Sequence, residues 1–132
     1  MARLSGKTAA ITGGAGGIGA AIAHRFAAED ATLALLDLNG DGAAQTAAAL
    51  KGPNSGHYGA AIDVGDETSV ENAFAAAAEA VGKIDILINT AAIAGASPVE
   101  EMAVSDWDQM LRINLRGTFL CCRAVMPAMR QR

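Results

Sequence analysis

The sequence has few aromatic residues and no surplus of positive charge. Aromatic residues make up 4% of the 132 residues, and the net charge at pH 7 is -4. Because so few large rings are available, the abundant alanine must fill the interior, which predicts Ala-lined helices packed closely on a sheet. A negative chain without a run of Lys or Arg does not attract nucleic acid or an anionic membrane. We therefore expect neither partner.

Cysteine and long apolar segments are also scarce. The only cysteines, Cys121 and Cys122, are adjacent, and helix neighbours point in different directions, so we expect no disulfide between them and a reducing compartment. The amino terminus has no apolar signal core, and no later apolar run reaches the roughly 20 residues that cross a bilayer. We expect a soluble, cytoplasmic protein and assign no metal site.

Short apolar segments and longer helical patterns alternate along the chain. We expect strands at residues 8–12, 32–36, 57–62 and 84–88, and helices at residues 17–28, 41–50, 66–81 and from about 105 onward. In the first helix Ile18, Ile22 and Phe26 recur every four positions, which places them on one side. Such alternation predicts parallel strands joined by right-handed crossovers. The expected fold class is therefore α/β, a doubly wound parallel sheet of about four strands, in a single domain of residues 1–132.

A glycine-rich segment, TGGAGGIG at residues 12–19, joins the first strand to the first helix. Backbone N–H groups and the helix dipole converge there, which predicts an anion site. Two registers fit: G-x-G-x-x-G with Gly14, Gly16 and Gly19, or T-G-x-x-x-G-x-G with Gly13, Gly17 and Gly19. A phosphate P-loop is excluded because Ala20 and Ala21 stand where Lys and Ser/Thr are required. The alternative is a turn that binds nothing.

An acidic residue ends the second strand. Asp37 lies 18 positions past Gly19, close to the roughly 20 expected of the acid that binds the adenosine ribose in dinucleotide-binding folds. A carboxylate there repels a 2′-phosphate, and residues 38–44 contain no Arg or Lys to reverse that preference. The pattern favours NAD over NADP. The alternative is an ordinary acidic turn residue.

With these residues placed, the chain resembles the short-chain dehydrogenase/reductase family from about Leu4 to its last residue. Thr12 and three glycines fall on that family's T-G-x-x-x-G-x-G loop, which selects the second register. The resemblance implies a Rossmann-like domain and hydride transfer between NAD and an alcohol or ketone substrate. It also implies a set of cofactor-binding residues: Thr12, Gly13, Gly17, Ile18, Gly19, Asp37, Leu38, Asp63, Val64, Asn89 and Ala91.

Asp63 and Val64 resemble the pair whose side chain and backbone contact adenine, although a loop or capping carboxylate is the alternative for Asp63. Residues 89–92 read Asn-Thr-Ala-Ala where the family usually has Asn-Asn-Ala-Gly. The extra Cβ at Ala92 narrows the room for backbone beside the cofactor.

Asn114 matches the family's catalytic asparagine on the last helix. Positions 107, 111, 114, 118, 121 and 125 alternate steps of four and three, which places Asn114 on an inward stripe with Trp107 and Leu111. A buried amide needs hydrogen-bond partners. The alternative is therefore a core asparagine bonded to nearby backbone, whereas the resemblance adds a water held for proton relay.

The family's catalytic Ser and Tyr-x-x-x-Lys have no counterpart in this sequence. The one tyrosine, Tyr58, is followed four positions later by Ile62, and the last serine and lysine, Ser105 and Lys83, precede Asn114. We expect a chain truncated before a fifth strand and inactive alone. An unpaired apolar edge would favour self-association. The alternative is a non-catalytic NAD- or ADP-ribose-binding module, or a subunit that needs a partner chain.

Overall fold

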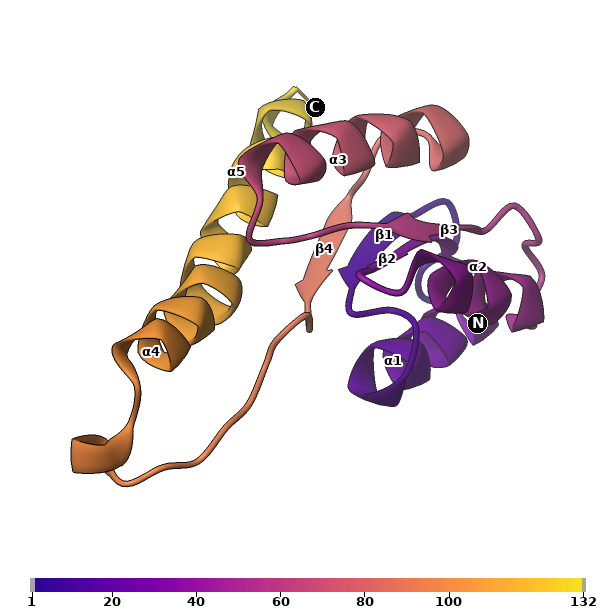
Figure 1. Cartoon of the computed structure of the whole chain (residues 1–132). Coiled ribbons are helices and arrows are strands. Elements are labelled where there is room, and N and C mark those ends of the chain that lie inside the picture. The colour runs from indigo at the N-terminus through magenta and orange to yellow at the C-terminus, as the bar shows by residue number, and fades with distance from the viewer. Residues whose placement is uncertain (1, 132) are drawn as a thin grey trace.

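A computed structural model of the chain describes residues 2–131 (Figure 1). Within these residues the strands are β1 (Thr8–Thr12), β2 (Thr32–Asp37), β3 (Tyr58–Ala61) and β4 (Ile86–Asn89). The α-helices are α1 (Gly17–Ala28), α2 (Gly40–Ala49), α3 (Glu67–Val81), α4 (Val104–Leu111) and α5 (Gly117–Arg130). A 3-10 turn spans Val99–Glu101, and a π-helical turn, Arg112–Arg116, joins α4 to α5. None of the helices described is long and apolar enough to traverse a bilayer.

The strands form one parallel sheet in the order β3-β2-β1-β4. Thr12 pairs with Leu36 of β2 and with Asn89 of β4, so the carboxyl ends of these strands lie at the same edge. The chain moves outward from β1 to β2 and β3, and then crosses to the opposite side of β1. This reversal creates the switch point at which doubly wound sheets bind ligands. The expected Rossmann-like α/β fold is confirmed.

Helices cover both faces of the sheet. Figure 1 shows α1 and α2 on one side and α3 and α5 on the other. Along β1, Ala9 and Ile11 belong to the cluster that contains Ala23 of α1, whereas Ala10 belongs to the cluster that contains Phe74 of α3 and Leu120 of α5. Successive residues of a strand point to opposite faces. The burial of both faces explains the nearly continuous apolar sequence of β1 and β2.

The side of α1 that faces the sheet is lined by small residues. Gly19, Ala23 and Ala27 are buried, whereas Ile18 is 73% exposed and Ile22 is half-buried. Small residues let the helix approach the strands closely, and the larger side chains lie beside this contact. The prediction of Ala-lined helices packed closely on a sheet therefore holds for α1.

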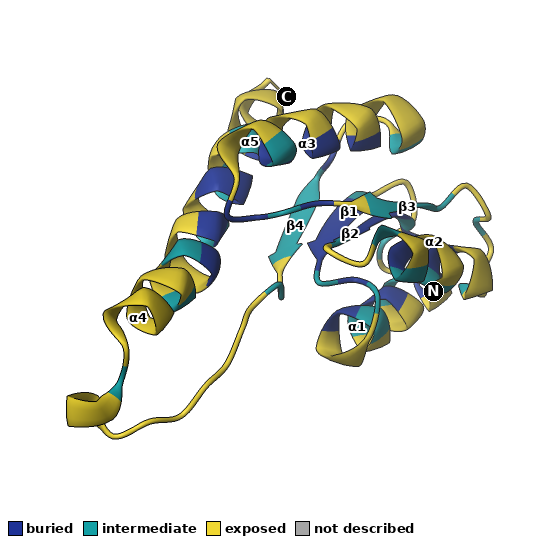
Figure 2. Ribbon diagram, viewed as in Figure 1, coloured by how far each residue is buried: buried dark blue, intermediate teal, exposed yellow. Residues whose placement is uncertain are grey.

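The prediction of an inward stripe along the last helix is wrong for the first half of that stripe. Trp107, Leu111 and Asn114 are exposed, whereas Ile113 and Gly117 are buried. A π turn contains more residues per turn than an α-helix, so Arg112–Arg116 rotates α4 relative to α5. One 3.6-residue stripe therefore cannot pass through both helices. Figure 2 shows the resulting change from an exposed α4 to an α5 that is buried on one side.

β4 lies at one edge of the sheet described and pairs with β1 alone. It begins at Ile86, two residues later than expected, because the Asp85 side chain accepts a hydrogen bond from Thr8 N at 3.0 Å. The residues of β4 are half-buried or exposed. After β4 the chain runs outward, and residues 92–101 are exposed (Figure 2).

Candidate nucleotide-binding site

A cleft of about 490 Å³ opens at the carboxyl ends of β1, β2 and β4. It contains all of the expected cofactor-binding residues except Thr12 and Asn89. Its walls are formed by Gly13, Gly16, Gly17, Ile18, Gly19, Asp37, Leu38, Ile62, Asp63, Val64, Thr90, Ala91, Ala92, Ile93 and Ile113. Residues from five separate segments of the sequence thus meet at the switch point of the sheet.

The glycine loop folds tightly against the end of β4. A Cβ added to Gly19 would lie 2.1 Å from Gly13 O, and one added to Gly13 would lie 2.9 Å from Ala91 N. Gly13 and Gly17 also have positive φ values of 71° and 55°, which strongly favour glycine. Gly16, by contrast, is extended and has open space around it. The geometry therefore gives a physical reason for glycine at positions 13, 17 and 19, the register that the resemblance selected.

The amino terminus of α1 opens onto this cleft. The helix begins at Gly17, and its N-cap residue, Gly16, provides no side-chain cap. The first N–H groups of a helix lack partners within the helix, and together with the helix dipole they favour an anion. This end of the cleft therefore favours a negatively charged group.

Thr12 lies beneath the cleft rather than in its wall. Its side chain is 1% exposed, and Oγ1 accepts a hydrogen bond from Ala91 N at 3.3 Å. Its carbonyl oxygen accepts hydrogen bonds from the backbone N–H and the hydroxyl of Thr90. Thr12 therefore joins the glycine loop to the chain that follows β4. Asn89 is exposed, and its side-chain amide lies 3.7 Å from Cys122 Sγ, outside the cleft wall.

The Asp37 carboxylate is held at the end of β2. Its Oδ2 accepts a hydrogen bond from Ala15 N of the glycine loop, and its Oδ1 accepts one from Asn39 N, each at 3.0 Å. Asp37 is half-buried, and the neighbouring Leu38 is 78% exposed at the cleft rim. The acid is thus fixed beside the glycine loop with part of its surface open to a ligand.

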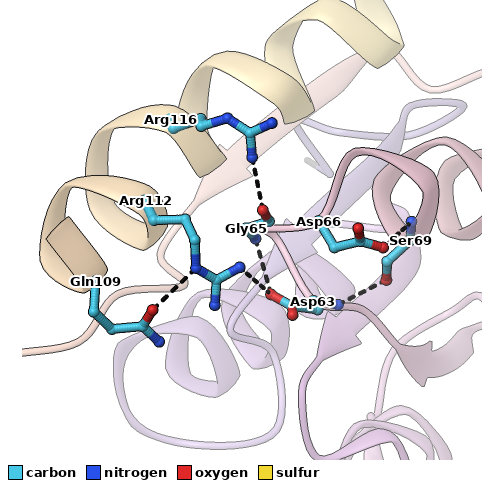
Figure 3. Close-up of polar contacts among 7 residues, drawn as sticks. All are labelled: Asp63, Gly65, Asp66, Ser69, Gln109, Arg112 and Arg116. Atoms are coloured by element: carbon cyan, nitrogen blue, oxygen red, sulfur yellow. Dashed lines mark hydrogen bonds and ion pairs between the residues drawn. The ribbon is translucent and has the colours of Figure 1, made fainter. Parts of the chain in front are cut away.

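Asp63 and Val64 follow β3 on another wall of the cleft. Asp63 Oδ1 accepts a hydrogen bond from Gly65 N at 2.9 Å and lies 3.7 Å from Arg112 Nη1 (Figure 3). Val64 is buried against α5, where a Cβ on Gly117 would lie 2.8 Å from Val64 Cγ2. This wall is therefore fixed to the π turn and α5 rather than only to the sheet.

Asn114 holds the exposed chain after β4. Its Nδ2 donates to Ile93 O at 2.8 Å, and its Oδ1 accepts from Ile93 N at 2.9 Å. Asn114 is exposed and lies outside the cleft wall, but Ile93 is part of that wall. Bonding to nearby backbone was one of the two expectations for this amide, although the bonded segment lies 21 residues away rather than in a buried core. The π turn carries Asn114, and such turns are frequent at functional sites.

Several residues of the cleft wall were not in the expected cofactor-binding set: Gly16, Ile62, Thr90, Ala92, Ile93 and Ile113. Of these, Gly16 belonged to the other glycine register, and Ala92 was expected beside the cofactor. Ile62 and Thr90 directly follow strands, and residues at the carboxyl ends of parallel strands line such clefts. That position was a usable signal. Ile113 reaches the cleft only because α5 packs on the loop after β3, and the sequence contains no signal for that contact.

The other reactive side chains are remote from the cleft wall. Burial raises the pKa of the Cys121 thiol to about 12, with a smaller contribution from Cys122, so this thiol stays protonated and packs within α5. Tyr58 is half-buried on β3, at the opposite edge of the sheet from β4. Neither residue lines the cleft.

A glycine loop at the switch point of a parallel sheet, with an acid at the end of the second strand, defines a Rossmann-like dinucleotide-binding fold. Residues 7–132 match the family model described as short chain dehydrogenase. The chain therefore belongs to the short-chain dehydrogenase family of oxidoreductases.

Curated relatives agree with this assignment. The chain is 51% identical over 123 residues to a D-threitol dehydrogenase of Mycolicibacterium smegmatis, a match that covers 93% of this chain and 47% of that protein. It is 44% identical to a 2-dehydro-3-deoxy-L-rhamnonate dehydrogenase (NAD(+)) of Sphingomonas sp., over 96% of this chain and 50% of that protein. A sorbitol dehydrogenase of Cereibacter sphaeroides is 40% identical over 96% of this chain and 48% of its own length. The chain spans about half the length of these relatives.

Proposed function

We propose that this chain binds NAD in the cleft and serves an oxidoreductase that transfers hydride between NAD and an alcohol or ketone. The main observation is the Asp37 carboxylate, which the Ala15 N–H holds beside the glycine loop. In this proposal residues 1–132 form one nucleotide-binding domain. The glycine loop binds the pyrophosphate, Asp37 accepts hydrogen bonds from the adenosine ribose, and Asp63 with Val64 contacts adenine.

The charge around Asp37 supports NAD as the preferred dinucleotide. The 2′-phosphate of NADP would face this carboxylate and be repelled by it. Residues 38–44 contain no Lys or Arg that could neutralise the phosphate. Leu38 and Asn39 follow directly and are exposed, so they offer no cation at this place. The name of the Sphingomonas sp. relative includes NAD(+), which agrees with the choice of NAD.

The glycine loop supports this proposal. Side chains at positions 13 and 19 would collide with backbone atoms of Ala91 and Gly13, so glycine lets the loop pack tightly at the amino terminus of α1, where an anion is favoured. When bound, NAD supplies the nicotinamide ring that accepts or gives the hydride. This chain's own contribution is to hold the dinucleotide, and Asn114 keeps Ile93 in the cleft wall.

We infer that the 132-residue chain binds NAD without turnover. A proton must leave or join the substrate oxygen when hydride moves, and the family's Tyr and Lys have no counterpart in this sequence. Tyr58 lies on β3, across the sheet from the Asn114 contact, and Ile62 stands four positions after it. Clear NADH formation by this chain with threitol or sorbitol would contradict this inference.

Calorimetric titration with NAD, NADP and ADP-ribose tests the binding proposal. We expect NAD and ADP-ribose to bind with similar affinity, because the groups that recognise the adenosine and pyrophosphate are present. NADP should bind at least about tenfold more weakly, a free-energy difference of about 1.4 kcal/mol. The proposal fails if the wild-type chain binds none of the three, or if Asp37→Ala leaves the affinity for NAD unchanged.

A second candidate function is a subunit or self-associating module that binds NAD without chemistry. β4 is an edge strand of the sheet described, and Leu115 and Phe119 are 67% and 57% exposed on the neighbouring helical segment. Exposed apolar surface and a free strand edge favour association. Light scattering of the purified chain should then show a species larger than a monomer. A monodisperse monomer with a cooperative thermal transition would exclude self-association.

A further inference from the structure

The guanidinium group of Arg112 lies between Gln109 of α4 and the loop that follows β3 (Figure 3). Its Nη1 is 3.7 Å from Asp63 Oδ1, and its Nε donates a hydrogen bond to Gln109 Oε1 at 3.0 Å. A Cβ added to Gly65 would lie 2.1 Å from Nη1 and 2.6 Å from Cζ. Glycine at position 65 therefore leaves the space that the guanidinium occupies beside Asp63.

The two oxygens of the Asp63 carboxylate have different surroundings. Oδ1 accepts the Gly65 N–H and faces Arg112. Within residues 2–131, the side-chain hydrogen bonds and ion pairs of this carboxylate all reach Oδ1. Because Asp63 is part of the cleft wall, Oδ2 remains an acceptor for a donor on a bound ligand.

We propose that Arg112 is a positioning residue that fixes the Asp63 carboxylate, so that the cleft selects a 6-aminopurine over a 6-oxopurine. This inference rests on the proposed binding of NAD. The amino group of adenine donates hydrogen bonds, whereas the 6-oxo group of hypoxanthine only accepts them and is repelled by a carboxylate. A carboxylate held on one oxygen by Gly65 N–H and Arg112 cannot readily turn away from the 6-oxo group.

The π turn explains how Arg112 reaches this position. It carries Arg112 and Arg116 to the same loop, where Arg116 Nη1 donates to Gly65 O at 2.7 Å. The Arg116 side chain thus holds the loop backbone without an ion pair to Asp63, as Figure 3 shows. Arg116 therefore provides a matched control, because its loss weakens the same loop but leaves the Asp63 carboxylate paired.

The test compares the affinities of the chain for NAD and for nicotinamide hypoxanthine dinucleotide, which differ at position 6 of the purine. Calorimetry gives the ratio of the two dissociation constants. We expect the wild-type chain to prefer NAD by about tenfold, as the loss of one hydrogen bond to a charged group implies. Arg112→Gln should reduce this ratio to about threefold or less, mainly through weaker binding of NAD, whereas Arg116→Gln should keep the wild-type ratio.

Gly65→Ala provides an independent route to the same outcome. Gly65 does not have a positive φ, so alanine fits the backbone, but its Cβ must displace the flexible end of Arg112. The ratio should therefore fall as it does in Arg112→Gln, although the arginine is retained. Asp63→Asn is the reference for complete loss of discrimination, because an amide can also donate to a 6-oxo group. Thermal melts of every variant identify any that fail to fold.

The outcomes separate the two proposals. If the wild-type chain binds neither dinucleotide, the proposed function and this inference both fail. If it binds both equally, the selection of a 6-aminopurine is overturned while the proposed binding of NAD stands. If Arg112→Gln and Gly65→Ala keep the wild-type ratio while Asp63→Asn loses it, the role of Arg112 is overturned. A fall of the ratio in Arg116→Gln equal to that in Arg112→Gln would show general loosening of the loop and would also overturn it.

Discussion

The glycine loop and the chain after β4 border the same cleft, but they are held in different ways. The loop is fixed by buried contacts: Thr12 is 1% exposed, and Gly19 touches the Gly13 backbone so closely that a side chain would not fit. Residues 92–101 are exposed, and their connection to the rest of the chain includes the paired hydrogen bonds between Ile93 and Asn114.

This difference separates a rigid wall from a loosely held one. Segments with few buried contacts open at low free-energy cost, whereas segments in the core open only when the protein unfolds. We therefore expect substitutions in the glycine loop to change both stability and affinity. Substitutions at Asn114 should change the motion of one segment and leave the fold intact.

The largest effect should come from Gly19→Ala. The new Cβ would meet Gly13 O, a backbone atom that cannot move without distorting the loop. We expect the free energy of unfolding to fall by about 1–3 kcal/mol, as in other overpacked interiors, and NAD binding to become undetectable. Urea denaturation and calorimetry measure the two effects. Gly16→Ala is the control, because a Cβ there meets nothing within 4 Å, and an equal loss of stability in both variants would contradict the rigid-wall description.

Asp37→Ser should have the next largest effect, on affinity more than on stability. Loss of the carboxylate removes the proposed ribose acceptor and the repulsion of a 2′-phosphate. We expect NAD to bind about tenfold more weakly and the preference for NAD over NADP to fall by about the same factor. Asp41→Ser is the matched control, since Asp41 is exposed in the first turn of α2. A preference that stays unchanged in Asp37→Ser would contradict the assignment of this carboxylate.

Asn114→Ala should loosen the exposed segment selectively. It removes both hydrogen bonds to Ile93, so the Ile93 amide should exchange with solvent at least about tenfold faster, the consequence of about 1.4 kcal/mol of lost local stability. Global stability should change by less than about 1 kcal/mol, because Asn114 is exposed. Hydrogen exchange followed by NMR resolves the two. Ser105→Ala, an exposed change on α4, should leave this exchange rate unaltered, and protection of Ile93 retained in Asn114→Ala would refute the role of the amide.

The smallest effect should be a pH dependence that arises outside the cleft, at the amino-terminal ends of β2 and β3. Burial lowers the pKa of His57 below its ordinary value of 6.5, against a smaller opposing contribution from Asn54, and His57 Nδ1 accepts a hydrogen bond from Leu33 N. Because the unfolded state binds the proton more readily than the folded state, the contribution of neutral His57 to the free energy of unfolding is fully present above about pH 6.5. This contribution is lost as the pH falls below that value.

Urea midpoints measured between pH 8 and pH 5 test this pH dependence. His57→Asn should show a smaller decrease than the wild type, whereas the exposed His24→Gln should decrease like the wild type. An identical decrease in all three proteins would assign the acid sensitivity to other groups.

The sequence predicted the fold most accurately where local and tertiary preferences agree. β1 and α1 have the predicted bounds, because the apolar run of β1 ends at glycines that begin the next helix. The four-residue apolar repeat of α1 did not show which side is buried: Ile18 is exposed, and the sheet packs on Gly19, Ala23 and Ala27. Hydrophobicity identifies a helix, but the closeness of packing decides which side faces inward.

In the candidate site, too, some features could be predicted from the sequence and others could not. Glycine spacing and Asp37 can be read from the sequence because the loop geometry restricts residue types locally. The contacts of Arg112 with Asp63 and of Asn114 with Ile93 join residues 49 and 21 positions apart. They depend on a π turn whose rotation the α-helical period cannot predict.

By itself, the sequence determined the alternation of strands and helices, the glycine loop between β1 and α1, and the acid at the end of β2. These features are local, because backbone sterics and hydrophobic period act within a few residues. The tertiary structure decided which face of each helix is buried, that Thr12 supports the cleft from below, and that the π turn holds Asp63 and Ile93. These contacts depend on how separate segments pack, and packing is settled only when the whole sheet and its helices are assembled.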